Sequence, residues 1–118
     1  MLGNLGNMAG MLKQAQQMQA QMKKMNKKLE AARVEGNAGG GMVVAECTGT
    51  AEFISIRIDP SLFEEKDKDL MESLTLAAIN DARDKAQALA KEEMEAAAAE
   101  MGIPPGLFSG EGIPGLGI

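Results

Sequence analysis

Apolar side chains recur at alternating spacings of three and four residues through the first quarter of the chain. They are Met8, Met11, Ala15, Met18, Met22, Met25, Leu29 and Ala32. This period predicts one long amphipathic helix over residues 8–33, with its apolar stripe packed on another helix rather than lining a ligand groove. Burial of each large side chain is worth on the order of 1.5–3 kcal/mol, so the stripe requires a partner. We therefore expect a dimer seam at Met11, Ala15, Met18, Met22, Met25 and Leu29.

After the glycine-rich segment at residues 36–41, apolar and polar residues alternate along the chain. The glycine-rich segment itself is interpreted as a hairpin loop rather than a phosphate-binding loop. Two strands are predicted at residues 42–48 and 51–58, joined by a tight turn at Gly49, and a third short strand at 33–36 is compatible with the sequence. Ile54, Ile56 and Ile58 share one face of the second predicted strand. Since an isolated hairpin is marginally stable, we expect this isoleucine face to pack on a helix.

A second long helix is predicted after Asp59-Pro60. Ser61 and Glu64 match a capping box, and the helix is expected to restart near Asp67 and to end near Met101. Its stripe is rich in alanine, which permits close approach of another helix. The stripe residues are Met71, Leu74, Ala78, Ala82, Ala86 and Leu89.

These elements predict an α+β fold with a long N-terminal helix, a small antiparallel sheet of two or three strands, and a long C-terminal helix. One domain is expected over residues 8–101, between a frayed N-terminus at 1–7 and a flexible Gly/Pro-rich tail at 102–118. Among the chain's 118 residues are 10 Met but only 3 Phe and no Trp or Tyr, so a large compact core is not expected. Such long helices exceed what the sheet can cover, which favours a symmetric homodimer.

Charge is distributed very unevenly along the chain. Residues 1–34 contain six basic side chains and one acidic, whereas residues 35–118 contain six basic and sixteen acidic. A cationic helix in an acidic chain indicates a polyanionic partner, although charge alone leaves DNA, RNA and an anionic membrane as alternatives. The basic residues are Lys13, Lys23, Lys24, Lys27, Lys28 and Arg33.

The chemical inventory disfavours catalysis. The chain has no histidine, the commonest general base and zinc ligand, and a single cysteine, Cys47, which we interpret as a small buried side chain. We expect no enzyme activity, metal site, cofactor or small-molecule substrate. No apolar run is long enough to span a membrane, and we expect a cytoplasmic protein without a membrane partner.

Four segments carry a family resemblance: GMLKQAQQMQAQMKKM at 10–25, IRIDPSL at 56–62, LAAINDARDKAQ at 76–87 and MGIPPG at 101–106. In this order and spacing, the chain resembles the bacterial YbaB/EbfC nucleoid-associated proteins. The resemblance implies an α+β homodimer, intertwined or tweezer-like with projecting helices, that binds DNA and associates with the nucleoid.

The resemblance also supplies candidate DNA-contacting residues. Those within the matching segments are Lys13, Gln14, Gln17, Lys23, Lys24, Arg83 and Lys85. Charge and helical phase add Lys27, Lys28 and Arg33.

We therefore expect a dimeric protein that binds double-stranded DNA and affects nucleoid organisation and gene expression. The scarcity of aromatic residues disfavours base stacking, and so predicts duplex binding with low sequence specificity. The alternative is a dimeric structural or interaction protein whose basic helix is only a solvated face. A third interpretation is a basic helix that binds a membrane surface.

Overall fold

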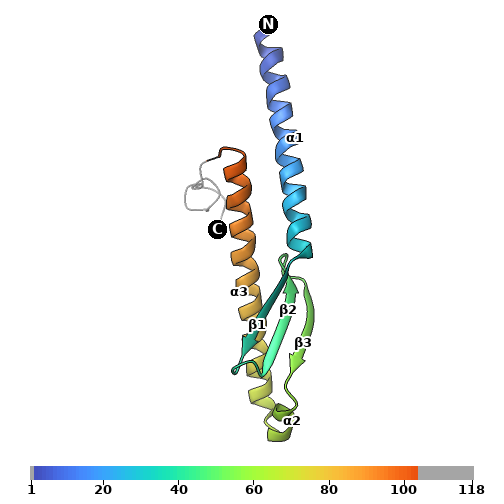
Figure 1. Cartoon of the computed structure of the whole chain (residues 1–118), viewed down its shortest axis with the longest axis vertical. Coiled ribbons are helices and arrows are strands. Elements are labelled where there is room, and N and C mark those ends of the chain that lie inside the picture. Colours follow the sequence, from blue (N-terminus) through green and yellow to red (C-terminus); the bar gives the residue numbers. More distant parts are fainter. Residues whose placement is uncertain (1, 104–118) are drawn as a thin grey trace.

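The chain folds into an elongated body of two long helices and a small sheet. The computed structural model describes residues 2–103, and side chains from residue 6 onward. Its elements are α1 (Leu2–Ala31), β1 (Arg33–Ala38), β2 (Val43–Thr48), β3 (Phe53–Ile58), α2 (Ser61–Glu65) and α3 (Lys68–Glu100). The fold extends 77 × 28 × 18 Å (Figure 1). The predicted α+β class is confirmed; most of the predicted Gly/Pro-rich tail lies outside the described residues.

Helix α1 begins at Leu2 and ends at Ala31. The helix is therefore longer at its N-terminal end than the predicted 8–33, because residues 2–7 are helical as well. Gly3 and Gly6 each weaken a helix by up to about 1 kcal/mol relative to Ala. However, extension of an existing helix adds one hydrogen bond per residue without a new nucleation step, which favours continuation through these positions.

The sheet is antiparallel with strand order β1-β2-β3. The additional strand considered at 33–36 is present as β1 and extends to Ala38. It pairs along its whole length with β2, from Arg33↔Thr48 to Ala38↔Val43. Residues 39–42 form the turn between β1 and β2, as the glycine-rich sequence predicts. On the other side of β2 the register shifts at Glu46/Cys47, so that Ile54 is left unpaired in a bulge.

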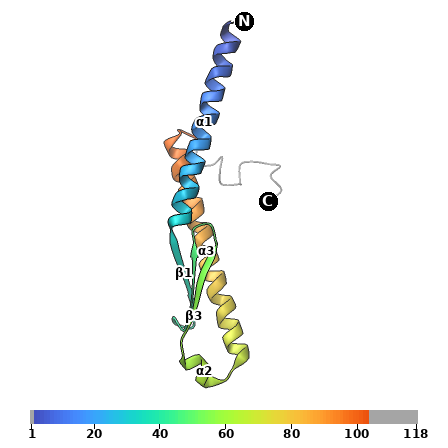
Figure 2. The same cartoon turned by 90° about the vertical axis from the view of Figure 1, so that its right-hand side faces the viewer.

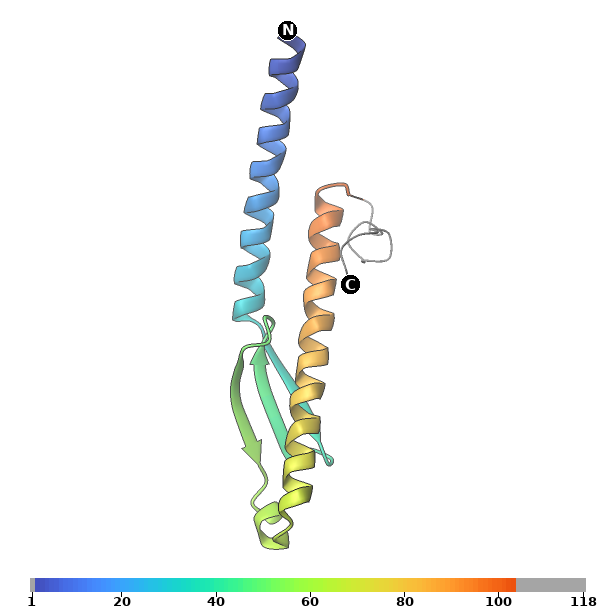
Figure 3. The same ribbon diagram turned by 180° about the vertical axis from the view of Figure 1, so that it is seen from behind.

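The core lies between the sheet and the lower half of α3, which covers one sheet face (Figures 1 and 3). Its buried members come from β2, from α2 and from the predicted alanine stripe, and are Val43, Ala45, Cys47, Leu62, Ala78, Ala82 and Ala86. Cys47 is therefore a structural side chain, as expected, and burial raises the pKa of its thiol. The alanine stripe of α3 is the helix face that contacts the sheet, rather than a second helix.

Gly36 on β1 explains why the contact face of α3 is built from alanine. A Cβ atom added at Gly36 would lie 2.6 Å from Ala82 Cα and would also overlap the Ala82 nitrogen and the Ala78 carbonyl oxygen. Backbone of β1 thus rests directly on backbone of α3, with no side chain between them. This close approach fixes the position of α3 on the sheet.

The isoleucine face of β3 is only partly covered: Ile58 packs against the core as predicted, whereas the other two isoleucines are exposed. Ile54 and Ile56 remain 49% and 40% exposed. The reason is geometric: α3 lies over β1 and β2, leaving β3 as an outer strand beyond the helix. The bulge additionally takes Ile54 out of the alternation.

The connection from β3 to α3 also differs in detail from the prediction. Ser61 makes no capping hydrogen bond; instead its backbone N–H donates to Asp59 Oδ1 at 2.9 Å. Helix α2 ends at Glu65, and its C-cap Lys66 has a left-handed φ of 54°. The predicted restart is confirmed, since Asp67 caps α3 by accepting a hydrogen bond from the Leu70 N–H at 3.0 Å.

A polar clamp holds β1 to the exposed side of α3. Asp81 Oδ2 accepts a hydrogen bond from the Asn37 N–H at 3.0 Å and pairs with Lys85 Nζ at 3.0 Å. Lys85 Nζ also donates to the Glu35 carbonyl oxygen at 3.3 Å. The Asn37 N–H, with a smaller contribution from Lys85, lowers the pKa of the Asp81 carboxyl.

Substitution of Gly36 by Ala tests the backbone contact. The added methyl group meets backbone atoms that cannot rotate away, so we expect a loss of about 1–3 kcal/mol in the free energy of unfolding. Gly10→Ala is the matched control, because a Cβ there meets nothing within 4 Å. Thermal or denaturant unfolding distinguishes them; equal stability of Gly36→Ala and the wild type would contradict the close approach.

The Asp81 clamp predicts a specific acid dependence. A carboxyl whose pKa is lowered on folding stabilises the protein above the unfolded value, near 3.8 for Asp, and that stabilisation is lost as pH falls through the folded value. Asp81→Asn should therefore lower the melting temperature at neutral pH and flatten its decline below about pH 4. Asp84→Asn removes the same charge from an exposed position of the same helix. Identical pH profiles for both variants would show that the clamp contributes nothing.

Candidate nucleic-acid interface

Most of the candidate DNA-contacting residues lie on α1, which runs beside the end of α3 beyond the sheet. The two helices are antiparallel, and α1 continues well beyond the end of α3 (Figures 1 and 2). Residues 6–20 of α1 are all exposed. The chain therefore presents a projecting helix that its own fold covers only near its base.

The predicted dimer seam is divided by this arrangement. Met25 and Leu29 are 8% and 4% exposed, because they lie at the base of α1, where it packs within its own chain. Met11, Met18 and Met22 are 70%, 39% and 46% exposed. Part of the stripe is thus used for internal packing, and only its outer part is available to a second molecule.

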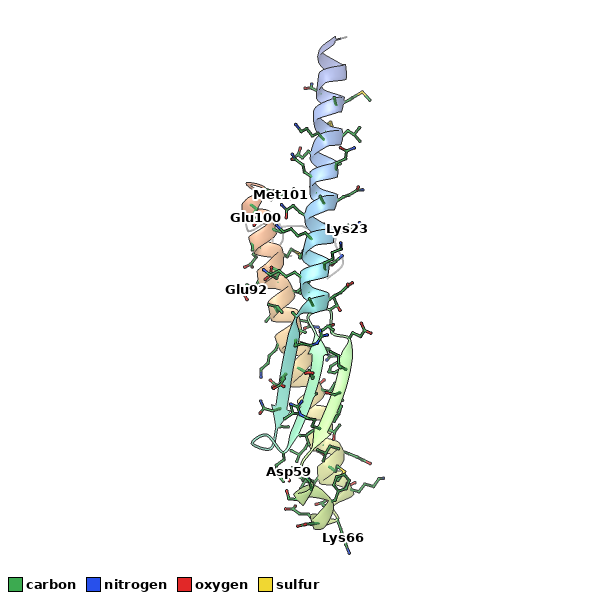
Figure 4. The ribbon with its side chains drawn as sticks, turned by 45° about the vertical axis from the view of Figure 1, so that its right-hand side comes forward. Lys23, Asp59, Lys66, Glu92, Glu100 and Met101 are labelled. Atoms are coloured by element: carbon green, nitrogen blue, oxygen red, sulfur yellow. The ribbon has the colours of Figure 1, made fainter. Side chains whose placement is uncertain are left out.

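The basic side chains of α1 are exposed and occupy two of its sides. Lys23 points away from α3 (Figure 4). It shares a shallow surface hollow with Lys27, Met18 and Met22. Lys24 and Lys28 instead line the space between the two helices.

The space between the helices forms a polar groove, here called the interhelix groove. Helix α1 contributes Gln14, Gln17, Gln21, Lys24 and Lys28, and α3 contributes Glu93, Ala96, Ala97 and Glu100, followed by its C-cap Met101. Gln21 was missed from the sequence, although Gln14, Gln21 and Lys28 recur at intervals of seven. That recurrence is the signal that places the three on one side of the helix.

One ion pair closes the base of the interhelix groove. Lys28 Nζ lies 3.0 Å from Glu93 Oε2, and the lysine side chain is 68% exposed while that of the glutamate is only 18% exposed. The carboxylate is thus held close to α1, whereas the lysine remains open to solvent. Neither Glu93 nor Glu100 was identified as a functional residue from the sequence.

The other three candidates do not join the α1 cluster. Arg33 lies at the start of β1, where its guanidinium donates to the Glu30 and Ala32 carbonyl oxygens at 3.0 and 3.1 Å and so caps the end of α1. Arg83 and Lys85 lie on the part of α3 that packs on the sheet, and Lys85 belongs to the Asp81 clamp. All three remain exposed, but the fold already gives Arg33 and Lys85 a structural role.

The geometry of α1 suits a phosphate backbone. Lys13 to Lys28 extend over about 22 Å of helix, or roughly two thirds of a turn of duplex DNA. Lysine is a flexible donor with a compact charge, suited to phosphate contacts without a fixed angle. None of the helices between residues 2 and 103 is long and apolar enough to cross a membrane.

Two relatives with known names are similar to the chain over most of its length. The chain is 39% identical over 104 residues to a nucleoid-associated protein of Bradyrhizobium diazoefficiens, covering 88% of this chain and 98% of the relative. It is 41% identical over 106 residues to a nucleoid-associated protein of Nitrobacter hamburgensis, covering 90% and 100%.

A solved structure supports the same fold. The crystal structure of an uncharacterized protein from Helicobacter pylori matches with a TM-score of 0.56 and 28% identity, covering 64% of this chain and 87% of that one. The profile of the YbaB/EbfC DNA-binding family matches residues 4–101. The chain therefore belongs to the YbaB/EbfC DNA-binding family.

Proposed function

We propose that this protein is a homodimeric, nucleoid-associated protein that binds double-stranded DNA with low sequence specificity. The observation that carries the proposal is the set of exposed lysines on α1: Lys13 lies within the uncovered residues 6–20, and Lys23, Lys24, Lys27 and Lys28 lie nearer the sheet. Membership of the YbaB/EbfC family and the names of the two relatives support DNA as the polyanion. Binding of this kind would affect nucleoid organisation and, through it, gene expression.

The proposed mechanism is electrostatic. The α1 lysines neutralise phosphates and release condensed counterions, while Gln14 and Gln17 hydrogen-bond to the DNA backbone or to base edges. The ten candidate contacts are Lys13, Gln14, Gln17, Lys23, Lys24, Lys27, Lys28, Arg33, Arg83 and Lys85, and those on α1 form the centre of the site. Neutralising about four to six phosphates predicts a slope near −4 to −5 for log affinity against log salt.

Low sequence specificity follows from what α1 offers to a base. Lysine and glutamine can contact many phosphate and base positions, and the helix has no aromatic side chain for stacking. Phe53 and Phe63, the phenylalanines within the described residues, lie on β3 and α2, away from the projecting part of α1. Recognition of duplex shape and charge is therefore favoured over sequence readout.

The dimer is proposed to form through an apolar surface between β3 and α3. The inner face of β3 extends past α3, leaving Phe53 and Ile56 39% and 40% exposed. It adjoins a groove lined by Ile58, Lys68, Met71, Glu72, Thr75, Leu76 and Ile79, in which Leu76 is 61% exposed. We call these residues the β3–α3 surface. A contiguous apolar surface of this kind is typical of a self-association site.

The exposed methionines of α1 are a less favourable place for the first contact between two copies. Pairing two α1 helices along Met11, Met18 and Met22 would bring together two strongly basic helices. Like charges across a helix pair oppose association unless a polyanion neutralises them. The β3–α3 surface carries no such excess of positive charge.

The alternative function is a dimeric interaction protein whose lysines serve only as a solvated face. It predicts the same dimer without duplex binding. A membrane-surface role predicts instead that the intact dimer sediments with anionic vesicles.

Removal of Lys23, Lys24, Lys27 and Lys28 by substitution with Ala tests the DNA contact. Loss of four cationic side chains should reduce the salt slope to about half or less while the dimer persists. Fluorescence anisotropy of a labelled duplex across a salt series measures the slope. Lys66→Ala is the control, since Lys66 lies at the opposite end of the molecule (Figure 4). An unchanged slope in the quadruple variant would remove these lysines from the interface.

Leu76→Glu tests the dimer surface. A charge placed on the β3–α3 surface should raise the dimer dissociation constant about tenfold or more without disturbing the buried core. Light scattering should then report a mass falling towards the 12.4 kDa of one chain. Met18→Glu places the same charge on the α1 stripe and should leave the dimer intact. The reverse result would place the interface on the seam expected from the sequence.

A further inference from the structure

The end of α3 beside the basic helix is strongly acidic. Between residues 86 and 103 the only basic side chain is Lys91, against Glu92, Glu93, Glu95 and Glu100. The C-terminal end of a helix also carries a partial negative charge from its unpaired carbonyl groups. The projecting cationic helix is thus accompanied along its lower part by an anionic one.

Two of these glutamates face α1, and one clearly does not. Glu93 and Glu100 line the interhelix groove opposite Lys24 and Lys28. Glu92 points away from α1, on the outer side of α3 (Figure 4). The acidic charge is therefore partly directed at the same lysines that are proposed to contact DNA.

The Lys28–Glu93 pair has unequal partners. Glu93 is held beside Met25, Ala96 and Ala97, and its side chain is largely shielded from solvent. A partly desolvated carboxylate attracts an ammonium group more strongly than a freely exposed one does. Lys28 is open to solvent on its other side and can be approached by a phosphate.

We propose that the acidic end of α3 competes with DNA for the groove lysines, acting as an intramolecular substitute for phosphate. Glu93 holds Lys28, and Glu100 lowers the positive potential around Lys24. A duplex must displace these carboxylates before it gains the two lysines. This inference rests on the proposed DNA-binding function and adds a restraint on its affinity.

The restraint has a selective consequence. A single phosphate or a short polyanion cannot contact the outward lysines and the groove lysines together, so it gains little by displacing Glu93. A duplex that is already bound along Lys23 and Lys27 presents many phosphates at once. The α3 carboxylates thus weaken binding to small anions while still allowing binding to a long duplex.

The test compares Glu93→Gln with Glu92→Gln in duplex binding by the full-length protein. Both variants remove one negative charge from adjacent positions of α3, but only the first faces α1. Glu93→Gln should raise duplex affinity about fivefold at low salt. It should also steepen the salt slope by about 0.9, the contribution of one further neutralised phosphate. Glu92→Gln should change affinity less than about twofold.

A double variant checks that the gain in duplex affinity depends on Lys28. In a Lys28→Gln protein, addition of Glu93→Gln should produce no further gain, because the restrained lysine is already absent. Circular dichroism verifies that each variant is folded; if Glu93→Gln is not, Glu100→Gln replaces it, with Lys24→Gln as its background. Duplex affinity is measured by fluorescence anisotropy with a labelled duplex of about 20 base pairs. Inorganic pyrophosphate is added as a competitor to measure binding of a short polyanion.

The outcomes separate this inference from the function on which it rests. If the wild type binds duplex but Glu93→Gln and Glu92→Gln increase affinity equally, net charge alone acts and the inference is overturned. A fall in affinity for Glu93→Gln would also overturn it, by showing that the carboxylate orients Lys28 productively. Absence of duplex binding by the wild type at low salt would instead reject the proposed function itself.

Discussion

The direct contact between the backbone of β1 and the alanine face of α3 is the constraint on which the rest of the structure depends. Gly36 meets Ala78 and Ala82 with no side chain between them, so the axis of α3 is fixed relative to the sheet. Since β1 follows α1 after a single residue, the sheet also fixes where α1 leaves the body. The spacing of the two projecting helices is therefore set in the core, well below the site that they form.

Helix α1 is basic and the end of α3 is acidic, so the two helices have different roles in the proposed DNA binding. Helix α1 carries exposed lysines along its length, and the end of α3 places carboxylates against its lower part. An acidic chain with net charge −5 can in this way keep a local cationic surface, because the charges are separated along one axis. In our proposal, DNA affinity depends on two sets of lysines. The outward lysines contact phosphate directly, whereas the groove lysines must first be released from the α3 carboxylates.

Much of the fold was accessible from the sequence, because its strongest signals are periodic. The alanine stripe of α3, the glycine turn after Ala38 and the restart at Asp67 all follow from local spacing and capping chemistry. What the sequence could not specify was which helix covers which strand. The exposure of Ile56 and the internal burial of Met25 and Leu29 are tertiary outcomes of where α3 lies. For the same reason Lys28 was identified as a candidate but its carboxylate partner, Glu93, was not: the two are distant in sequence and meet only because α3 runs antiparallel to α1.

The central claim is that duplex DNA contacts α1 rather than the sheet or the base of the molecule. Titration of isotope-labelled protein with a duplex, followed by backbone amide NMR, tests it most directly. The account predicts that the largest shifts and line broadening fall between Lys13 and Lys28, with smaller changes near Glu93 and Glu100. Perturbations concentrated on α2 or on the outer face of the sheet, with α1 unaffected, would contradict it.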